Sequence, residues 1–421
     1  MESKTRPSNL KALLLTREYP PDVYGGAGVH VDYLARELAQ RTQVEVRTFG
    51  TQQIQAGNLI VHGHHFAQAE PEDTPERFLP ALQALRVCLS FTARRIDADI
   101  VHCHTWYAHF GGVLARMLYG IPLVITAHSL EPLRPWKREQ LGSGADLSGW
   151  IERTALESAD AVVAVSRQMQ VDILRHFNVP PQKVTVIHNG IDIEEYRPVT
   201  SRGRLARFGI APDRLYVLFV GRISRQKGIL HLINAIPFLD PGAQVILCAS
   251  TPDSMEIAKE VKEAVDRLGA RPGRVIWIRE MVDRATAIEL YSHAAVFCCP
   301  SIYEPFGIIN LEAMACQTPV VASAVGGITE VVVHGETGYL IPMIQQAEPP
   351  FEPVDPDQFS RDLARHINLL LADSSLRRQM GVKGRQRAET TFSWGAIANQ
   401  VLVLYESLVR QHPRVAGMSA G

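Results

Sequence analysis

The sequence predicts an α/β protein built from two domains, each with a parallel β-sheet. The chain has 421 residues, and chains longer than about 250 residues usually divide into domains of about 100–200 residues. Short runs rich in Val, Ile and Leu alternate with amphipathic stretches almost to the C-terminus. Such runs lack polar alternation, which is typical of strands covered by helices on both faces.

The apolar runs predict the strands in chain order. In the first half they lie at residues 12–15, 44–48, 100–102, 123–126, 161–165 and 184–187. In the second half they lie at residues 217–220, 244–248, 275–278, 296–299 and 320–322. An amphipathic helix over residues 29–40 illustrates the connecting pattern, because Val29, Tyr33 and Leu34 share one apolar stripe.

A polar segment at residues 197–213 separates the two strand-rich blocks. We therefore expect a first domain over residues 1–197 and a second over residues 198–393. A last amphipathic helix over residues 394–409 is long enough to pack on either domain.

Composition excludes several classes of protein. The 43 Lys and Arg residues nearly balance the 44 Asp and Glu residues, so there is no basic surplus for a nucleic-acid partner. The apolar stretch at residues 10–15 is too short for a signal peptide or membrane span. Six cysteines without a C-x-x-C spacing favour a reducing cytoplasm. The sequence leaves homo-oligomer formation open.

Glycines follow the first predicted strand. Gly25, Gly26 and Gly28 precede a helix expected to begin near Val29, and they allow close approach of an anion to the helix N-terminus. One alternative is a dinucleotide-binding fingerprint, which lacks its third glycine here. The other alternative is a turn in which the glycines only supply conformational freedom to the backbone and bind no anion.

Two cations follow the first strand of the second half. Arg222 and Lys227 lie after residues 217–220, at the strand end that carries the ligand in open α/β sheets. Arg offers a bidentate fork to phosphate and Lys a point charge, so the pair suits a departing diphosphate. The alternative is a solvated basic loop.

Two glutamates, Glu304 and Glu312, are separated by seven residues. Glu304 lies in a loop after a predicted strand, Gly307 or Ile308 starts a helix, and Glu312 lies in an early turn of that apolar helix. A carboxylate there needs hydrogen-bond donors, and sugar hydroxyls are suitable. The helix N–H groups at Gly307 and Ile308 can face a phosphate. The alternatives are a capping or solvent-facing role for Glu312 and a helix-entry signal at Glu304.

These residues together resemble the retaining GT-B glycosyltransferases of family 4. The motifs are Gly25-Gly26, Arg222 with Lys227, and Glu304 with Glu312. The resemblance runs from about Leu13 to the last helix and is nearest to the actinobacterial-type glycogen synthases, also described as α-maltose-1-phosphate synthases. The stretches that carry it are residues 15–21, 102–108, 126–137 and 220–228.

The resemblance implies two Rossmann-like domains facing a central cleft, with a helix at about residues 394–413 crossing back to the first. It implies glucose transfer from ADP-glucose, with retention at the anomeric carbon, to glucose 1-phosphate or an α-1,4-glucan end. Arg222 and Lys227 would hold the diphosphate and Glu312 the ribose. Glu304 would bind a donor sugar hydroxyl, with His128 beside the sugar. The longer glycogen and starch synthases carry a Lys and an Asp where this chain has Val23 and Thr105.

His128 and the loop after it fit this placement. His128 follows the strand at residues 123–126, where a neutral imidazole can bond a sugar hydroxyl; the alternative is a core histidine. Arg134, Lys137 and Arg138 form a cationic cluster that suits an acceptor phosphate, and Trp136 could stack on a sugar. The alternative is an exposed basic loop.

No metal ion or other cofactor is expected. His62, His64 and His65 look like a loop, whereas His102 and His104 share one side of a strand end. A D-x-D at residues 97–99 precedes its strand, away from the ligand edge.

The expected mechanism is same-face attack, in which the leaving phosphate accepts the acceptor proton. Two other classes remain open, namely a nucleotide-sugar epimerase of the same architecture and a non-catalytic binding protein.

Overall fold

The computed structural model describes residues 10–23, 25–65, 75, 78–136, 144–269, 274–347 and 351–412. Two compact units divide the chain. One unit runs up to Gly190 and resumes at Trp394, and the other comprises Ile191–Ser393. The boundary lies before the predicted residue 197, because residues 191–196 are bonded to the second unit. The N–H of Ile191 donates to Phe392 O at 2.8 Å, and Arg385 Nη1 donates to Tyr196 O at 3.1 Å.

The first unit contains an eight-stranded sheet in the order β3-β4-β2-β1-β5-β6-β7-β8. Its strands are β1 (Lys11–Thr16), β2 (Gln43–Phe49), β3 (Gln53–Ala56), β4 (Leu59–His64), β5 (Ile100–His104), β6 (Leu123–Ala127), β7 (Ala161–Ala164) and β8 (Val184–Val186). Its helices are α1 (Gly26–Ala39), α2 (Leu79–Phe91), α3 (Trp106–Tyr119), α5 (Gly144–Ser158), α6 (Arg167–His176) and α14 (Trp394–Gln411), with 3₁₀ turns η2 (Glu131–Leu133) and η3 (Pro181–Lys183).

All six strands predicted for this half are present, and two more lie at the sheet edge. β3 pairs antiparallel with β4, which pairs parallel with β2. Every residue of β3 is exposed, so it carries no apolar run. The predicted loop at the first histidine group is wrong, because His62 and His64 lie in β4 beside the buried Val61.

The second unit contains a six-stranded parallel sheet in the order β11-β10-β9-β12-β13-β14. Its strands are β9 (Tyr216–Ile223), β10 (Gln244–Pro252), β11 (Val275–Ile278), β12 (Val296–Cys299), β13 (Val320–Ser323) and β14 (Gly338–Ile341). Its helices are α7 (Ile229–Ala235), α8 (Met255–Arg267), α9 (Arg284–His293), α10 (Ile308–Ala315), α11 (Ile328–Val331), α12 (Pro356–Ala372) and α13 (Ser374–Thr391), with η4 (Ala206–Phe208) and η5 (Ile236–Phe238). The prediction missed β14, which begins with a glycine and is only partly buried.

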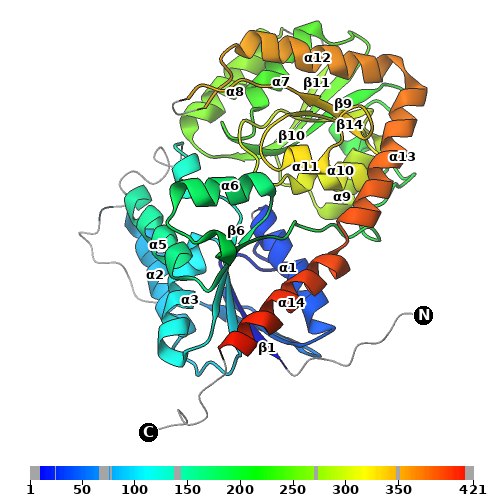
Figure 1. Cartoon of the computed structure of the whole chain (residues 1–421). Coiled ribbons are helices and arrows are strands. Elements are labelled where there is room, and N and C mark those ends of the chain that lie inside the picture. The colour runs from blue at the N-terminus through cyan, green and yellow to red at the C-terminus, as the bar shows by residue number, and fades with distance from the viewer. Residues whose placement is uncertain are drawn as a thin grey trace. The chain divides into compact units, whose positions relative to one another are not determined.

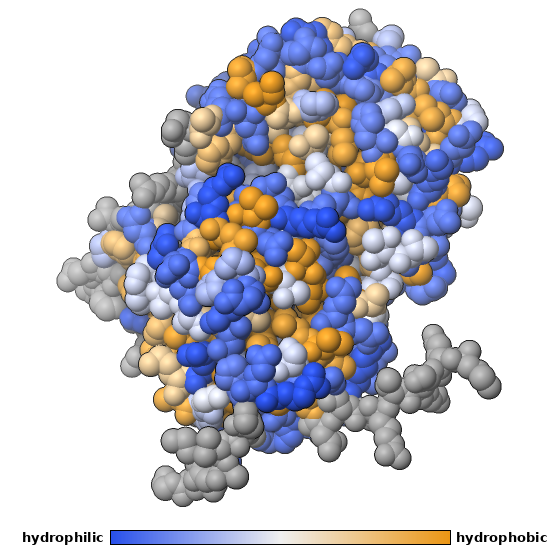
Figure 2. All heavy atoms as spheres, in the orientation of Figure 1, coloured by the Kyte–Doolittle hydropathy of each residue, from blue (hydrophilic) through white to orange (hydrophobic). Residues whose placement is uncertain are grey.

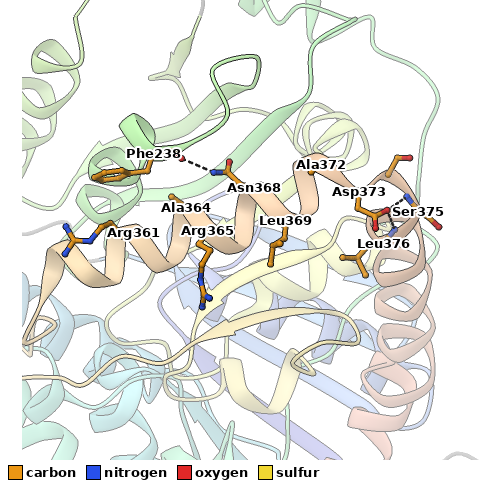
Figure 3. Close-up of a pocket in the computed structure, with 11 residues that line it drawn as sticks. Phe238, Arg361, Ala364, Arg365, Asn368, Leu369, Ala372, Asp373, Ser375 and Leu376 are labelled. Atoms are coloured by element: carbon orange, nitrogen blue, oxygen red, sulfur yellow. Dashed lines mark hydrogen bonds between the residues drawn. The ribbon is translucent and has the colours of Figure 1, made fainter.

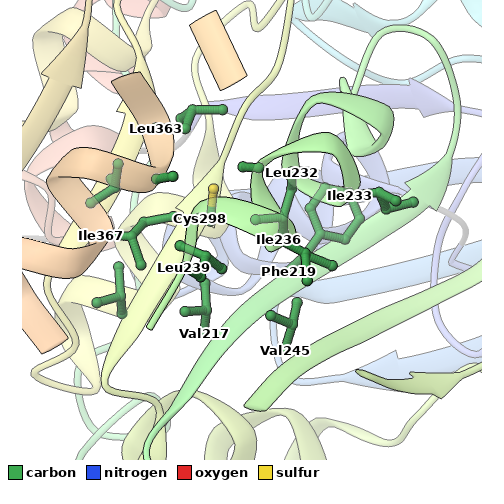
Figure 4. Packing of buried hydrophobic residues seen from close by; sticks show 14 of the residues in the cluster. Val217, Phe219, Leu232, Ile233, Ile236, Leu239, Val245, Cys298, Leu363 and Ile367 are labelled. Carbon is green, nitrogen blue, oxygen red and sulfur yellow. The ribbon is translucent and has the colours of Figure 1, made fainter. Parts of the chain in front are cut away.

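Each unit has its own core between sheet and helices. In the first, α14 packs beside α1 (Figure 1), and Trp394 stacks on Tyr33 with ring centroids 5.6 Å apart. In the second, side chains of α7 and α12 such as Leu232 and Ile367 meet Val217 of β9 (Figure 4). Because helices cover the sheet faces, the polar loops gather at the strand ends.

Among the described residues, every helix falls short of the length or the hydropathy that crossing a lipid bilayer requires. On the face shown in Figure 2, hydrophobic side chains are interspersed with hydrophilic ones.

Candidate active site

Two loops of the second unit bring predicted donor-site residues together. Lys227 lies in the turn between β9 and α7, and Glu304 in the loop between β12 and α10. Lys227 Nζ donates to Glu304 Oε2 at 2.7 Å across a separation of 77 residues. Since β9 and β12 are parallel neighbours, their carboxyl ends lie at one edge of the sheet, where α/β proteins bind ligands.

This ion pair is largely removed from solvent. The side chains of Lys227 and Glu304 are 16% and 9% exposed. The buried hydroxyl of Ser301 adds a second donor to Glu304 Oε2, at 3.1 Å. Low local dielectric strengthens attraction between the charges and penalises either charge alone.

Arg222 forms a second ion pair at the same edge. Its Nη1 contacts Oδ1 of Asp253, which follows β10. The guanidinium remains 39% exposed, so it is accessible to an anion. Sequence reasoning did not identify Asp253, whose only signal is its place after a strand that neighbours β9.

Two glycines let the loops at this edge pack backbone to backbone. Gly326 has φ +51°, and a Cβ on it would lie 2.1 Å from the carbonyl oxygen of Glu304. Gly228 has φ +60°, and its Cβ would lie 2.0 Å from Pro300 O. The N–H of Gly327 also donates to the carbonyl of Glu304 at 3.0 Å. The backbone position of Glu304 therefore depends on glycine in a neighbouring loop.

Glu312 has a different environment from Glu304. α10 begins at Ile308 after Gly307, as predicted, and Glu312 lies in its second turn. The hydroxyl of Tyr291 donates to Glu312 Oε2 at 2.8 Å. Burial raises the pKa of Glu312, and hydrogen bonds from Tyr291 and Tyr196 partly oppose that rise. Glu312 is half-buried, and tyrosines from the same unit hold its carboxylate.

The glycine cluster of the first unit lies at the start of a helix, with Gly25 at the N-cap and Gly26 and Gly28 within the first turn. α1 begins at Gly26 with Gly25 as its N-cap, since the N–H of Val29 donates to Gly25 O at 3.3 Å. The expected start near Val29 is therefore wrong. The N–H of Gly25 donates to Glu18 Oε2 at 2.9 Å, so a carboxylate of the chain itself occupies one donor of this N-terminus.

His128 lies directly after β6 and belongs to a cluster of imidazoles. Its Nε2 is 3.0 Å from Nδ1 of His104, at the end of β5. Burial lowers the pKa of both rings well below the usual range, so they are neutral at pH 7. Behind them, His102 lies 2.6 Å from the hydroxyl of Tyr405 in α14 and 2.7 Å from that of Thr126. His128 is only half-buried and reaches the sheet edge, unlike a core histidine.

Of the predicted acceptor loop, Lys137 and Arg138 lie outside the described residues. The exposed-loop alternative is wrong for Arg134, whose side chain is 14% exposed and lies 4.0 Å from Glu131. Trp136 is buried at 4% exposure, which leaves little of its ring for a sugar. The acidic residues at 97–99 were predicted to lie in a loop. Asp99 accepts a hydrogen bond from the Lys11 N–H at 2.8 Å and so holds the amino end of β1.

A recess of about 930 Å³ lies elsewhere in the second unit, along α12 (Figure 3). It is lined by Phe238, Arg361, Arg365 and Leu369, among others. Asn368 also lines the recess, and its side-chain amide already donates to Phe238 O at 2.9 Å. The recess brings together no set of reactive groups comparable with the edge of β9 and β12.

Comparison with known proteins agrees with this geometry. Residues 24–195 match the family model Glycosyltransferase Family 4, and residues 205–349 match Glycosyl transferases group 1. The chain is 44% identical over 403 residues to an α-maltose-1-phosphate synthase of Mycolicibacterium smegmatis, covering 95% of this chain and 100% of that protein. It is 30% identical to a D-inositol 3-phosphate glycosyltransferase of Streptomyces bingchenggensis, covering 93% and 86% of the two chains. The solved sucrose-phosphate synthase from Thermosynechococcus elongatus superposes with a TM-score of 0.75 at 27% identity, covering 95% of this chain and all of the other.

Proposed function

Because the chain belongs to the glycosyltransferases of family 4, we propose that it transfers glucose from ADP-glucose to the 4-hydroxyl of glucose 1-phosphate. The product would be maltose 1-phosphate, with retention at the anomeric carbon. The observation that carries this proposal is the convergence of Arg222, Lys227 and Glu304 at the carboxyl edge of β9 and β12. This edge supplies cations for a diphosphate and a carboxylate for a sugar.

The proposed chemistry is the separation of charge at the glycosidic carbon. The bond from C1 of glucose to the β-phosphate oxygen breaks through an oxocarbenium-like state, and Arg222 and Lys227 stabilise the charge that develops on the diphosphate. The acceptor oxygen bonds to C1 on the same face, and its proton passes to the leaving phosphate. Glu304 and His128 would hold hydroxyls of the donor glucose, and Glu312 those of the ribose. Gly307, Ile308 and Gly26 at the N-terminus of α1 would add backbone donors to the donor site, and Gly25 would do so by exchanging Glu18 Oε2 for the donor substrate.

The acceptor is proposed to carry a phosphate. The names of the three similar proteins refer to maltose 1-phosphate, inositol 3-phosphate and sucrose phosphate, so each concerns a phosphorylated sugar or polyol. Arg134, with Lys137 and Arg138, would bind that phosphate. The proposed reaction requires no metal ion or other cofactor. The six cysteines are free thiols, which agrees with a cytoplasmic enzyme.

Product analysis tests the proposal. Purified protein is incubated with ADP-glucose and glucose 1-phosphate, with glycogen, or with no acceptor, and products are identified by ³¹P and ¹H NMR. The expected result is ADP and maltose 1-phosphate in equal amounts, with an α-linkage, only when glucose 1-phosphate is present. If the protein extends glycogen but forms no maltose 1-phosphate, the acceptor is a glucan end and not glucose 1-phosphate. Free nucleotide without any acceptor would instead favour an epimerase of the same architecture. UDP-glucose in place of ADP-glucose tests the nucleotide.

A further inference from the structure

Three imidazoles of the first unit meet at the carboxyl edge of its sheet. His30 comes from α1, which follows β1, whereas His104 ends β5 and His128 follows β6. These three strands are consecutive in the sheet. One ring nitrogen from each histidine lies within 4.8 Å of the other two. His30 and His104 are 2% and 0% exposed, and the half-buried His128 gives access from solvent.

Two nitrogens of this cluster are without hydrogen-bond partners in the described part of the chain, whereas His128 Nε2 lies 3.0 Å from His104 Nδ1 in a bond that an ion would replace. Burial lowers the pKa of His30 to about 4 and that of His104 well below its usual range, so both are neutral at pH 7. His30 Nδ1 lies 2.7 Å from Asn189 Oδ1; donation to that oxygen leaves the electron pair on Nε2. Among the described residues, His30 Nε2 and His104 Nε2 are buried without a hydrogen-bond partner. A buried polar atom without a partner destabilises the fold, and a bound ligand relieves that cost.

We propose that His30, His104 and His128 bind one divalent transition-metal ion. Neutral imidazoles without a carboxylate suit Zn²⁺, Co²⁺ or Ni²⁺ rather than Mg²⁺ or Ca²⁺. A tetrahedral ion with bonds of about 2.0–2.1 Å needs its ligand nitrogens about 3.3 Å apart, so nitrogens that lie within 4.8 Å of one another would move closer together on binding. Three protein ligands leave a fourth position open. Asn189 orients His30 in the way that outer hydrogen bonds orient metal-binding histidines.

Binding of the ion has a consequence for transfer that rests on the proposed function. An ion on His128 removes the nitrogen that would bind a sugar hydroxyl. The ion therefore inhibits transfer, which is distinct from a metal that assists the reaction. Metal binding itself does not depend on any sugar substrate.

Titration with Co²⁺ tests the site on the full chain after treatment with EDTA and without sugars. The expected result is one equivalent bound, with the visible absorption of tetrahedral Co²⁺. His30→Gln should weaken binding by about tenfold or more, and Asn189→Ala, which keeps all three ligands, by about tenfold. His62→Gln is the matched control, because His62 lies in β4 of the same unit outside the cluster, and it should bind as the wild type does.

Two results would overturn the site. One is the lack of saturable Co²⁺ binding to folded wild-type protein. The other is binding that survives His30→Gln and Asn189→Ala but is lost in His62→Gln. Inhibition of transfer by Zn²⁺, reversed by EDTA, is measured separately, so a protein without transferase activity can still confirm the site.

Discussion

Lys227 and Glu304 form an ion pair, with 2.7 Å between Nζ and Oε2, at the strand ends where the donor is proposed to bind. Both side chains are mostly buried, so each charge depends on the other in the free protein. A diphosphate arriving beside Lys227 would share its positive charge and release Glu304 toward a sugar hydroxyl. The pair therefore holds two groups that are proposed to bind the donor close together before the substrate arrives.

Lys227→Ala should lower kcat by about 10²–10³-fold, because it removes a cation that stabilises the leaving diphosphate. It also leaves Glu304 buried without its partner, which destabilises a protein by about 3–5 kcal/mol. Steady-state kinetics at saturating donor and urea unfolding measure the two effects.

A double variant separates catalysis from stability at this pair. In Lys227→Met with Glu304→Gln, no unpaired charge remains, so the free energy of unfolding should return close to that of the wild type. Activity should stay low. Recovery of turnover together with stability would contradict a catalytic role for Lys227.

Glu312→Gln should keep or raise the melting temperature while raising the KM for the donor by about tenfold or more. Burial raises the pKa of Glu312 in the folded protein. A carboxyl group with a raised pKa stabilises the fold at low pH, and that stabilisation is lost as the pH rises through the folded-state value. The increase in melting temperature caused by Glu312→Gln should therefore be larger at neutral pH than at low pH. Glu304→Gln, which breaks an ion pair, is the comparison and should lower the melting temperature.

Gly326→Ala should lower both activity and stability, because its Cβ would lie 2.1 Å from the carbonyl oxygen of Glu304. Gly335→Ala is the matched control. Gly335 also has a positive φ, at +77°, but nothing lies within 4 Å of its Cβ position. The control should cost only about 1–2 kcal/mol of backbone strain and leave kcat unchanged. Equal kinetic effects of the two variants would show that the contact with Glu304 has no role.

Acid should destabilise the first unit well above the pH at which carboxylates titrate. Burial lowers the pKa of His30 to about 4 and those of His102 and His109 to about 3. A histidine whose pKa is lowered in the folded state destabilises the fold as the pH falls through its ordinary pKa near 6.5, because only the unfolded chain then takes up the proton. One pH unit below that value, each costs about 1.4 kcal/mol. Urea unfolding at pH 7.5 and pH 5.5 checks this, and an unchanged unfolding free energy would contradict it.

The sequence predicted the strands that have continuously buried apolar runs but missed β3, β4 and β14, whose residues are exposed or only partly buried. β9 and β10 appear as clear runs of Val, Leu and other apolar residues. β3 is exposed along its whole length and takes its place from pairing with β4. Propensity and periodicity report burial, so an edge strand that buries nothing gives no signal.

Motif spacing identified the residues of the candidate site but not their partners. Adjacent positions in a parallel sheet could predict that Arg222, Lys227 and Glu304 share an edge. The pairing of Arg222 with Asp253 and the bond from Tyr291 to Glu312 depend on side-chain conformations. The grouping of His30 with His104 and His128 likewise depends on how α1 follows β1, which residue spacing does not encode.

Calorimetric titration with ADP tests whether the edge of β9 and β12 binds the donor diphosphate. Arg222→Gln keeps a donor for Asp253 but removes the charge, whereas Arg225→Gln removes a charge from the turn after β9, where Arg225 pairs with Glu260 at 2.7 Å. Arg222→Gln should weaken ADP binding by about tenfold or more, and Arg225→Gln should bind ADP as the wild type does. Wild-type affinity in Arg222→Gln, with the protein folded, would contradict it.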